Sequence, residues 1–244
     1  MDNEFSQAYR DLEKHHWWFR ARREILRSQI TSANLPEASE VLEIGVGSGE
    51  NLYSLYPDHV RLTGIEPFED NARYANDRGE IPVYTGTAEQ WPPELRTRTF
   101  DAICLFDVLE HIEDDSTALQ SFITHLNPGG LLFLSVPAYQ WMWGRQDEVS
   151  HHYRRYTYKM LSKRLQDAGF LIERSTYFNT LLFPAIVLQR MKQRLTRAEG
   201  SDFDQSYGKI EELFYRIFRT ERQILRAFPM PFGVSLFTSA RKPA

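Results

Sequence analysis

Three glycines in a short run, preceded by a carboxylate, form the most chemically informative pattern of this sequence. Gly45, Gly47 and Gly49 follow an apolar run, and Glu43 comes just before them. Glycine permits a tight turn and removes a Cβ where a ligand approaches the backbone. The spacing differs from the G-x-G-x-x-G of pyrophosphate-binding turns, and Glu43 would repel a pyrophosphate. The pattern therefore predicts a strand and turn that bind a ligand without phosphates, and it favours a cationic one.

A second carboxylate, Glu66, ends the next apolar run. A carboxylate at this place in an α/β fold can accept hydrogen bonds from both hydroxyls of a ribose. Taken alone, Glu66 is better explained as a solvated charge at the end of a strand. Its position after the glycine turn favours the ribose contact.

A segment rich in histidine, arginine and tyrosine follows the fifth apolar run. His151 and His152 can accept a proton near neutral pH, and Arg154 and Arg155 can bind a carboxylate or phosphate in bidentate fashion. The alternative is a loop in which Asp147 and the arginines pair with each other. We expect no metal site from Asp147 and the two histidines, because adjacent histidines rarely point the same way.

The elements that must position these residues are short strands between helices. From about residue 40 to 136, apolar β-rich runs alternate with polar helical segments. Five strands are expected at Val41–Ile44, Leu62–Ile65, Ile81–Tyr84, Asp101–Phe106 and Leu131–Val136. Continuous apolar runs of this length predict an α/β fold with a parallel sheet covered on both faces. Ligands bind such sheets at the carboxyl ends of the strands, where the glycine turn and the histidine loop would lie.

The flanking segments complete a single domain over residues 1–244. Their expected parts are an N-terminal helical cap (1–38, with one helix over Glu4–Ile30), a cofactor-binding core (39–178), a helical insertion (179–228) and a final strand (229–244). Within the core, a turn at Asn127–Gly130, a loop at Tyr139–Tyr156, a helix capped by Thr157 and ended at Gly169, and a sixth strand at Phe170–Tyr177 are expected. The insertion reads as two helices joined at Glu199–Asp202, and Val234–Ala240 reads as the last strand.

The amino-acid composition argues against several classes of function. The 244 residues are 42% hydrophobic and 25% charged, with a formal net charge of -4, so no basic field favours nucleic acid. The single cysteine, Cys104, leaves no internal disulfide and fits a reducing compartment. Neither a signal peptide nor an apolar run of roughly 18–20 residues is recognisable. We therefore expect a cytoplasmic protein that does not act on nucleic acid.

Four motifs in chain order resemble those of class I S-adenosylmethionine-dependent methyltransferases. They are Val41–Asn51, Leu62–Glu66, Thr87–Glu89 and Phe106–His111. The resemblance covers about Glu40–Val136 and extends more loosely to a bacterial small-molecule group with an aromatic-arginine N-terminus. His16–Arg23 and Pro231–Leu236 resemble that group. The family resemblance implies a Rossmann-like, seven-stranded, mostly parallel sheet with a helical insertion before the last strand.

The resemblance also implies site residues. Gly45 and Gly47 would contact the methionine part of S-adenosyl-L-methionine, Glu66 its ribose and Asp107 the region of its sulfonium. The full cofactor-binding set is Glu43, Gly45, Gly47, Gly49, Glu66, Ala88, Glu89, Asp107, Val108, Trp18 and Arg22. A similar His-x-Arg-Arg-Tyr-Thr run in the related group selects His152 as the catalytic histidine. His151, Arg154, Arg155 and Tyr156 then become the expected acceptor contacts.

Methyl transfer is an in-line displacement that needs alignment of the acceptor and, for a hydroxyl, a base. A histidine base slightly favours O-methylation of a small molecule, with S-adenosyl-L-homocysteine as the second product. The rivals are a non-catalytic cofactor-binding scaffold and, less well supported, a nicotinamide-dependent oxidoreductase. The insertion is expected to be a lid, a homodimer contact, a buried helix pair, or a peripheral membrane contact through residues 181–197, where an apolar block precedes basic residues.

Overall fold

One seven-stranded sheet organises the chain. The computed structural model describes residues 10–196 and 208–244. The strand order is β3-β2-β1-β4-β5-β7-β6. The strands span Glu40–Ile44 (β1), Arg61–Glu66 (β2), Val83–Thr85 (β3), Phe100–Phe106 (β4), Leu126–Pro137 (β5), Leu171–Phe178 (β6) and Ser235–Arg241 (β7). Strands β1 to β5 pair in parallel, and β7 lies antiparallel between β5 and β6. The predicted mostly parallel, Rossmann-like sheet is thereby confirmed.

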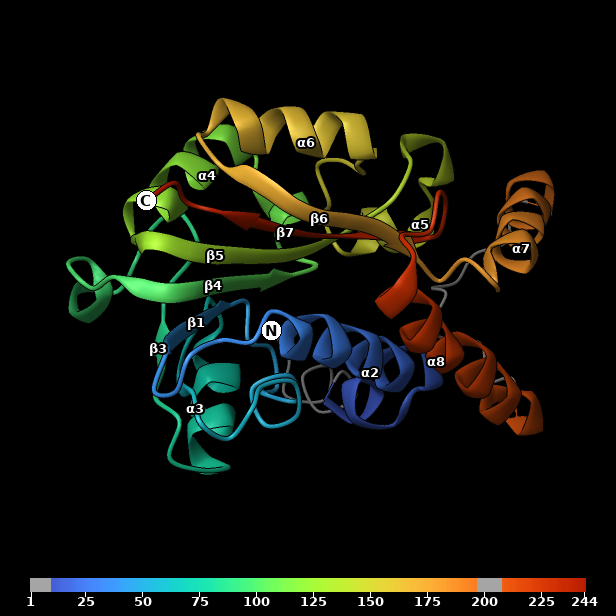
Figure 1. Ribbon diagram of the computed structural model, residues 1–244. Coiled ribbons are helices and arrows are strands. Elements are labelled where there is room, and N and C mark those ends of the chain that lie inside the picture. The colour runs from blue at the N-terminus through green and yellow to red at the C-terminus, as the bar shows by residue number, and fades with distance from the viewer. Residues whose placement is uncertain (1–9, 197–207) are drawn as a thin grey trace.

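Helices cover both faces of this sheet, which explains its continuous apolar strands. On one face lie α4 (Asp115–Thr124) and α6 (Tyr158–Asp167), whose leucines and Phe122 share a core with β4 and β5. On the other lie α2 (Trp17–Ser32), α3 (Glu69–Asp77) and α8 (Glu211–Ala227). Figure 1 shows the two layers above and below the strands. Thr157 caps α6 as expected, since its side chain accepts a hydrogen bond from the Met160 amide.

The N-terminal region differs from the single helix expected there. Residues 10–15 are helical, but His16 leaves the helical conformation (φ -64°, ψ 135°) and α2 begins at Trp17. The reason is a cap: the His16 ring nitrogen Nδ1 accepts a hydrogen bond from the Trp18 amide. The restart lets the Trp17 ring pack on Phe214 and Phe218 of α8, at centroid distances of 5.3 and 6.4 Å.

Two expected loops contain more regular structure than predicted. Asn127–Gly130 belongs to β5, where it forms a bulge between the pairs Phe100↔Leu126 and Ala102↔Leu131. Hydrogen bonds exchanged with Lys242 hold the bulge in the sheet. The loop after β5 includes the helices η3 (Gln140–Met142) and α5 (Arg145–Val149). Conversely, residues 50–54, between β1 and β2, form turns rather than one of the helical segments expected between the strands.

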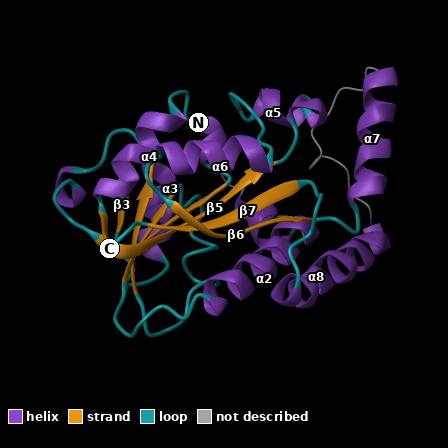
Figure 2. Ribbon diagram, turned by 45° about the horizontal axis from the view of Figure 1, so that its top comes forward, coloured by secondary structure: helices purple, strands orange, loops and turns teal. Residues whose placement is uncertain are grey.

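The insertion between β6 and β7 supplies α7 (Phe183–Thr196), η4 (Gly208–Ile210) and α8. Helix α8 packs against α2, whereas α7 stands at the edge of the molecule in both ribbon views (Figures 1 and 2). The predicted link at Glu199–Asp202 lies outside the described residues. Within the described ranges, every helix is too short or too polar to cross a membrane.

Candidate functional site

The glycine turn leaves β1 beside the carboxyl end of β2. Gly45 and Gly47 have φ values of +77° and +59°, a region that costs a residue with a Cβ about 1–2 kcal/mol. The Gly45 amide donates to the Ile65 carbonyl (2.8 Å), which holds the turn against β2. A Cβ on Gly45 would also collide with the Val108 side chain. Val108, one of the expected cofactor-binding residues, therefore packs over the turn.

Two carboxylates flank the turn, and both are buried. Glu43 accepts a hydrogen bond from the Tyr56 hydroxyl (2.6 Å), and Glu66 accepts one from the Gly47 amide (2.8 Å). Burial raises the pKa of Glu43 and that of Glu66 to about 7. The second Glu66 oxygen accepts longer bonds from the Phe68 amide and the Asn71 side chain. These contacts fix the Glu66 carboxylate at the carboxyl end of β2.

A third carboxylate, Glu13, reaches the turn from the N-terminal segment and was missed by sequence reasoning. Its Oε2 accepts a hydrogen bond from the Ser48 amide (3.0 Å), and its Oε1 would lie 2.9 Å from a Cβ on Gly47. Burial of this carboxylate raises the pKa of Glu13. None of Glu13, Glu43 and Glu66 forms an ion pair with a described residue. The turn is thus lined by three carboxyl groups that no described cation pairs with.

The buried arginine of α2 meets the ends of β4 and β5. Arg22 forms an ion pair with Asp107 (Nη2 to Oδ2, 2.7 Å), and the Ser135 hydroxyl contacts both groups. Asp107 itself has φ +58°, a strained value for a residue with a side chain. Trp18 lies one turn before Arg22, whose guanidinium is 5.4 Å from the Trp18 ring centroid. Sequence reasoning assigned all three residues to the cofactor site, and the structure brings them together.

The expected adenine contacts lie just after β3. Ala88 is buried, and its carbonyl accepts a hydrogen bond from the Trp91 indole (3.0 Å), whereas Glu89 is exposed. Thr85 at the end of β3 pairs with Glu66, so this segment starts from the same edge of the sheet as the glycine turn. Their contact with an adenine remains a prediction.

His152 is held by a buried carboxylate. Its Nδ1 lies 2.9 Å from Asp147 Oδ1, and the same oxygen accepts a hydrogen bond from Arg155 Nε (2.7 Å). Although burial alone raises the pKa of Asp147, the hydrogen bonds from His152 and Arg155 lower it to about 2. Asp147 therefore stays ionised and orients His152 with Nε2 directed away from it. This is the orientation that a general base requires.

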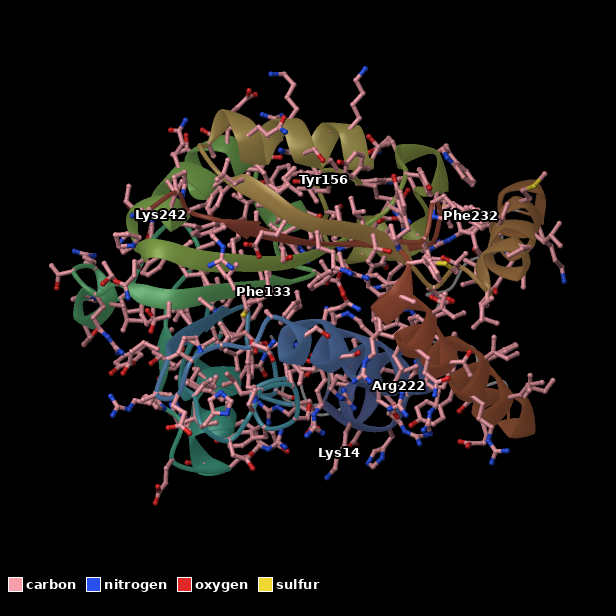
Figure 3. All side chains as sticks on the ribbon, in the orientation of Figure 1. Lys14, Phe133, Tyr156, Arg222, Phe232 and Lys242 are labelled. Carbon is pink, nitrogen blue, oxygen red and sulfur yellow. The ribbon has the colours of Figure 1, made fainter. Side chains whose placement is uncertain are left out.

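The other residues of this loop have internal partners. Arg155 and Tyr156 are buried, and Arg154 forms an ion pair with Asp115 (2.9 Å). The Tyr156 hydroxyl donates to the same Asp115 (2.9 Å), and Figure 3 shows Tyr156 between α6 and the sheet. His151 is exposed and has φ +56°. The structure thus matches the internally paired alternative for the arginines, and acceptor contacts by these four residues remain predictions.

Two further residues lie beside His152. Glu110 and His111 form the short helix η2 (Leu109–His111) after Asp107 and Val108. The His111 and His152 rings are 4.6 Å apart and nearly perpendicular. The sequence does show an acid and a histidine side by side after the fourth strand. Their importance depends on their burial, which cannot be read from the sequence.

Comparison with known proteins agrees with this arrangement. A family model described as a methyltransferase domain matches residues 15–175. The chain belongs to this family. The match runs from the residue before the His16 cap into β6, and so includes the site residues described above except Glu13.

Two relatives of the chain are named for methyl transfer to different atoms, one to oxygen and one to carbon. The chain is 27% identical over 111 residues to the ubiquinone biosynthesis O-methyltransferase of Vibrio cholerae, and the match covers 44% of this chain and 45% of that protein. It is 28% identical over 110 residues to the C-methyltransferase NovU of Streptomyces niveus, covering 44% of this chain and 26% of that protein. The matched region thus spans less than half the length of these relatives.

A solved structure shows the same fold. The N-methyltransferase NodS of Bradyrhizobium japonicum, solved with S-adenosyl-L-homocysteine, superposes with a TM-score of 0.59. The alignment covers 96% of this chain and 91% of NodS, at 18% identity.

Proposed function

We propose that the protein transfers a methyl group from S-adenosyl-L-methionine to a small molecule and releases S-adenosyl-L-homocysteine. The observation that carries this proposal is the glycine turn with Glu13, Glu43 and Glu66 around it. A pyrophosphate would be repelled by these three carboxylates, whereas the sulfonium and ammonium groups of S-adenosyl-L-methionine would be attracted. We expect Glu66 to accept hydrogen bonds from the ribose hydroxyls.

The remaining cofactor roles follow from position. Gly45, Gly47 and Gly49 would contact the methionine part, while Ala88 and Glu89 flank the adenine. Asp107, Val108, Trp18 and Arg22 would enclose the sulfonium end, where aromatic and ion-paired side chains exclude water. The membership of the chain in the methyltransferase family supports these assignments.

His152 is the residue that we propose to activate the acceptor oxygen. Its Nε2 takes the hydroxyl proton while the oxygen attacks the methyl carbon, the carbon–sulfur bond breaks, and the sulfonium becomes a neutral thioether. The Asp147 carboxylate stabilises the protonated ring. O-Methylation is favoured for this reason, although relatives named for O- and C-methylation share the domain. His151, Arg154, Arg155 and Tyr156 shape the loop around the acceptor.

We further propose that α7 contacts a membrane surface. Leu188 and Met191 are exposed on this helix, and Trp141 is exposed where it packs on Phe183. Lys192 supplies exposed basic charge, whereas Arg190 is turned inward against Gly144. Apolar side chains beside a cation suit a lipid interface. Homodimerisation through the same side chains is the rival, which a doubled mass in light scattering would establish.

Binding and product analysis test the methyl-transfer proposal. Calorimetry with S-adenosyl-L-methionine and with S-adenosyl-L-homocysteine should show saturable binding. Incubation with a small-molecule fraction of cell extract should then yield a methylated product by mass spectrometry. Cofactor binding without any methylated product would instead favour the scaffold rival. A cytoplasmic location and the domain boundaries at 38, 178 and 228 remain part of the proposal.

A further inference from the structure

A buried carboxylate next to the proposed site has no hydrogen-bond partner. Glu110 is inaccessible to solvent, and within the described ranges neither oxygen bonds outside its own residue. Burying a carboxylate without a partner is costly, and native structures rarely tolerate it without a reason. The structure therefore calls for a group that would satisfy Glu110.

Nearby ion pairs do not supply that group. Arg22 is paired with Asp107 (2.7 Å) and Arg155 with Asp147 (2.7 Å), so each arginine already faces one carboxylate. With both arginines engaged, an ionised Glu110 would have no cation of its own. A cation bound beside Glu110 would balance it.

Two histidines face this carboxylate. One donor atom each of Glu110, His111 and His152 lies within 4.8 Å of the other two. The His152 segment is tied to η2 by a hydrogen bond from the Tyr153 amide to the Glu110 carbonyl (2.8 Å). The three side chains thus come from two segments that the backbone holds together.

Both rings are oriented as metal-binding histidines usually are. His152 uses Nδ1 to contact Asp147, and His111 makes a hydrogen bond with the backbone of Ser150. Such contacts from the second ring nitrogen fix the tautomer and leave the first nitrogen free to bind a metal.

We propose that Glu110, His111 and His152 bind one divalent transition-metal ion. Two imidazoles and one carboxylate suit Zn²⁺, Fe²⁺, Co²⁺ or Mn²⁺, whereas Mg²⁺ and Ca²⁺ prefer oxygen ligands. Metal–ligand bonds of about 2.0–2.2 Å require the three donor atoms to draw closer by small side-chain rotations. Three protein ligands leave a coordination position open for a further oxygen.

This site would deepen the proposed function on which it rests. An acceptor hydroxyl bound at the open position would lose its proton to solvent more readily, and its oxygen would then attack the methyl carbon as the carbon–sulfur bond breaks. With the ion bound, His152 is a ligand that positions the metal. Without it, the same nitrogen is available as the base.

Cobalt binding tests the site without reference to activity. The full-length protein is stripped with EDTA and titrated with Co²⁺ by calorimetry and visible absorption, before and after competition with Zn²⁺. We expect one ion per chain, with the absorption of a Co²⁺ bound by nitrogen and oxygen ligands. Glu110→Gln and His111→Asn should each weaken binding by more than about tenfold, the smallest effect expected even for outer-shell partners. His59→Gln, an exposed histidine elsewhere, should bind as the wild type does.

Thermal stability separates a ligand from a structural residue. Glu110→Gln removes a buried charge, so the metal-free variant should melt no lower than the wild type, while the metal-induced rise in Tm disappears. If Glu110→Gln unfolds without metal, His111→Asn is used in its place in the same measurement. Absence of Co²⁺ binding, or binding unchanged in both variants, would overturn the proposal. S-adenosyl-L-methionine calorimetry on the stripped protein distinguishes that failure from a failure of the proposed function, because the cofactor should bind without metal.

Discussion

At the scale of single residues, strain and buried charge concentrate at the carboxyl ends of the strands. Gly45, Gly47 and Asp107 all have positive φ values there. Glu43, Glu66 and Glu110 are buried at the ends of β1 and β2 and just beyond β4. Each of these features costs stability in the absence of a ligand. Their coincidence at one edge of the sheet is what marks this edge as the binding site.

Gly47→Ala should weaken binding of S-adenosyl-L-methionine by about tenfold, the equivalent of about 1.4 kcal/mol. The new Cβ would press on the Glu13 carboxylate and would also force alanine into a left-handed conformation. Calorimetry measures the affinity. Gly129→Ala is the matched control, since Gly129 has a similar φ of +76° with open space around it. If both variants lost affinity equally, general strain rather than the cradle would be responsible.

Cofactor affinity should rise between about pH 5.5 and 8. The pKa of Glu43 and that of Glu66 are raised to about 7 by burial, so both acids become charged only over this range. For the ligand-free protein the same shifts act in the opposite direction: their stabilising effect is complete below pH 4.5 and is lost as the pH rises through 7. Calorimetry and thermal melting against pH measure the two trends. Glu66→Gln should flatten both, and an equally steep pH dependence in that variant would refute the assignment.

His152→Ala should lower kcat by about 10²-fold or more, because it removes the group that activates the acceptor. Affinity for S-adenosyl-L-methionine should change little, since His152 contacts Asp147 and His111 rather than the glycine turn. The measurement is the rate of S-adenosyl-L-homocysteine formation with an acceptor found in cell extract. Loss of cofactor binding or of the folded state would contradict this role.

At the scale of elements, side chains from distant segments join α2, the strands and the insertion. Arg22 ties α2 to the ends of β4 and β5. Glu221 of α8 is buried and accepts a hydrogen bond from the Leu181 amide (2.8 Å), which holds the segment between β6 and α7. The start of the insertion, at the base of α7, is therefore anchored to the last helix of the insertion.

Glu221→Gln should destabilise the protein by about 1–3 kcal/mol, because the carboxylate faces the amides of Leu181, Asn179 and Thr180. Glutamine keeps one acceptor oxygen but directs an NH2 donor at these backbone donors. For a chain of this size the midpoint of thermal unfolding should fall by about 2–4 °C per kcal/mol. Glu212→Gln provides the control on the same helix, since Glu212 is exposed and pairs with Arg216. A melting temperature equal to that of Glu212→Gln would show that Glu221 does not anchor the insertion.

Sequence patterns predicted elements best where burial is uniform along the element. All seven strands overlap the ranges expected for them. The pattern is clearest in the central strand β4, which is almost wholly apolar because both of its faces are covered. The break at His16 was missed, since it depends on one side-chain cap. The bulge at Gly129 was read as a turn, because its hydrogen bonds come from Lys242, far along the chain.

The residues of the candidate site could be predicted where they follow a strand closely in the sequence. The glycine turn, Glu43, Glu66, Asp107 and His152 all come just after strands or in the loop beyond β5. Glu13 could not be found, because its contact with Ser48 joins two segments that no local pattern connects. Glu110 resembles a surface acid within the run Glu110–Asp115, and only the fold shows that it is buried.

At the scale of the whole molecule, α7 carries exposed apolar side chains at the edge of the structure (Figure 2). Replacing Leu188 and Met191 together by serine should reduce co-sedimentation with anionic lipid vesicles. Each exposed apolar residue contributes up to roughly 1.5–3 kcal/mol when buried, so the loss should exceed tenfold in partition. Leu213→Ser, on the exposed side of α8, is the control. Unchanged sedimentation of the double variant would remove the membrane proposal.

The central claim is that the glycine turn and its carboxylates hold an S-adenosyl ligand. Isothermal titration of the purified chain with S-adenosyl-L-methionine, S-adenosyl-L-homocysteine and NAD in parallel tests it most directly. We predict saturable binding of both S-adenosyl ligands at one site per chain, and no binding of NAD. Binding of NAD without binding of either S-adenosyl ligand would contradict the account.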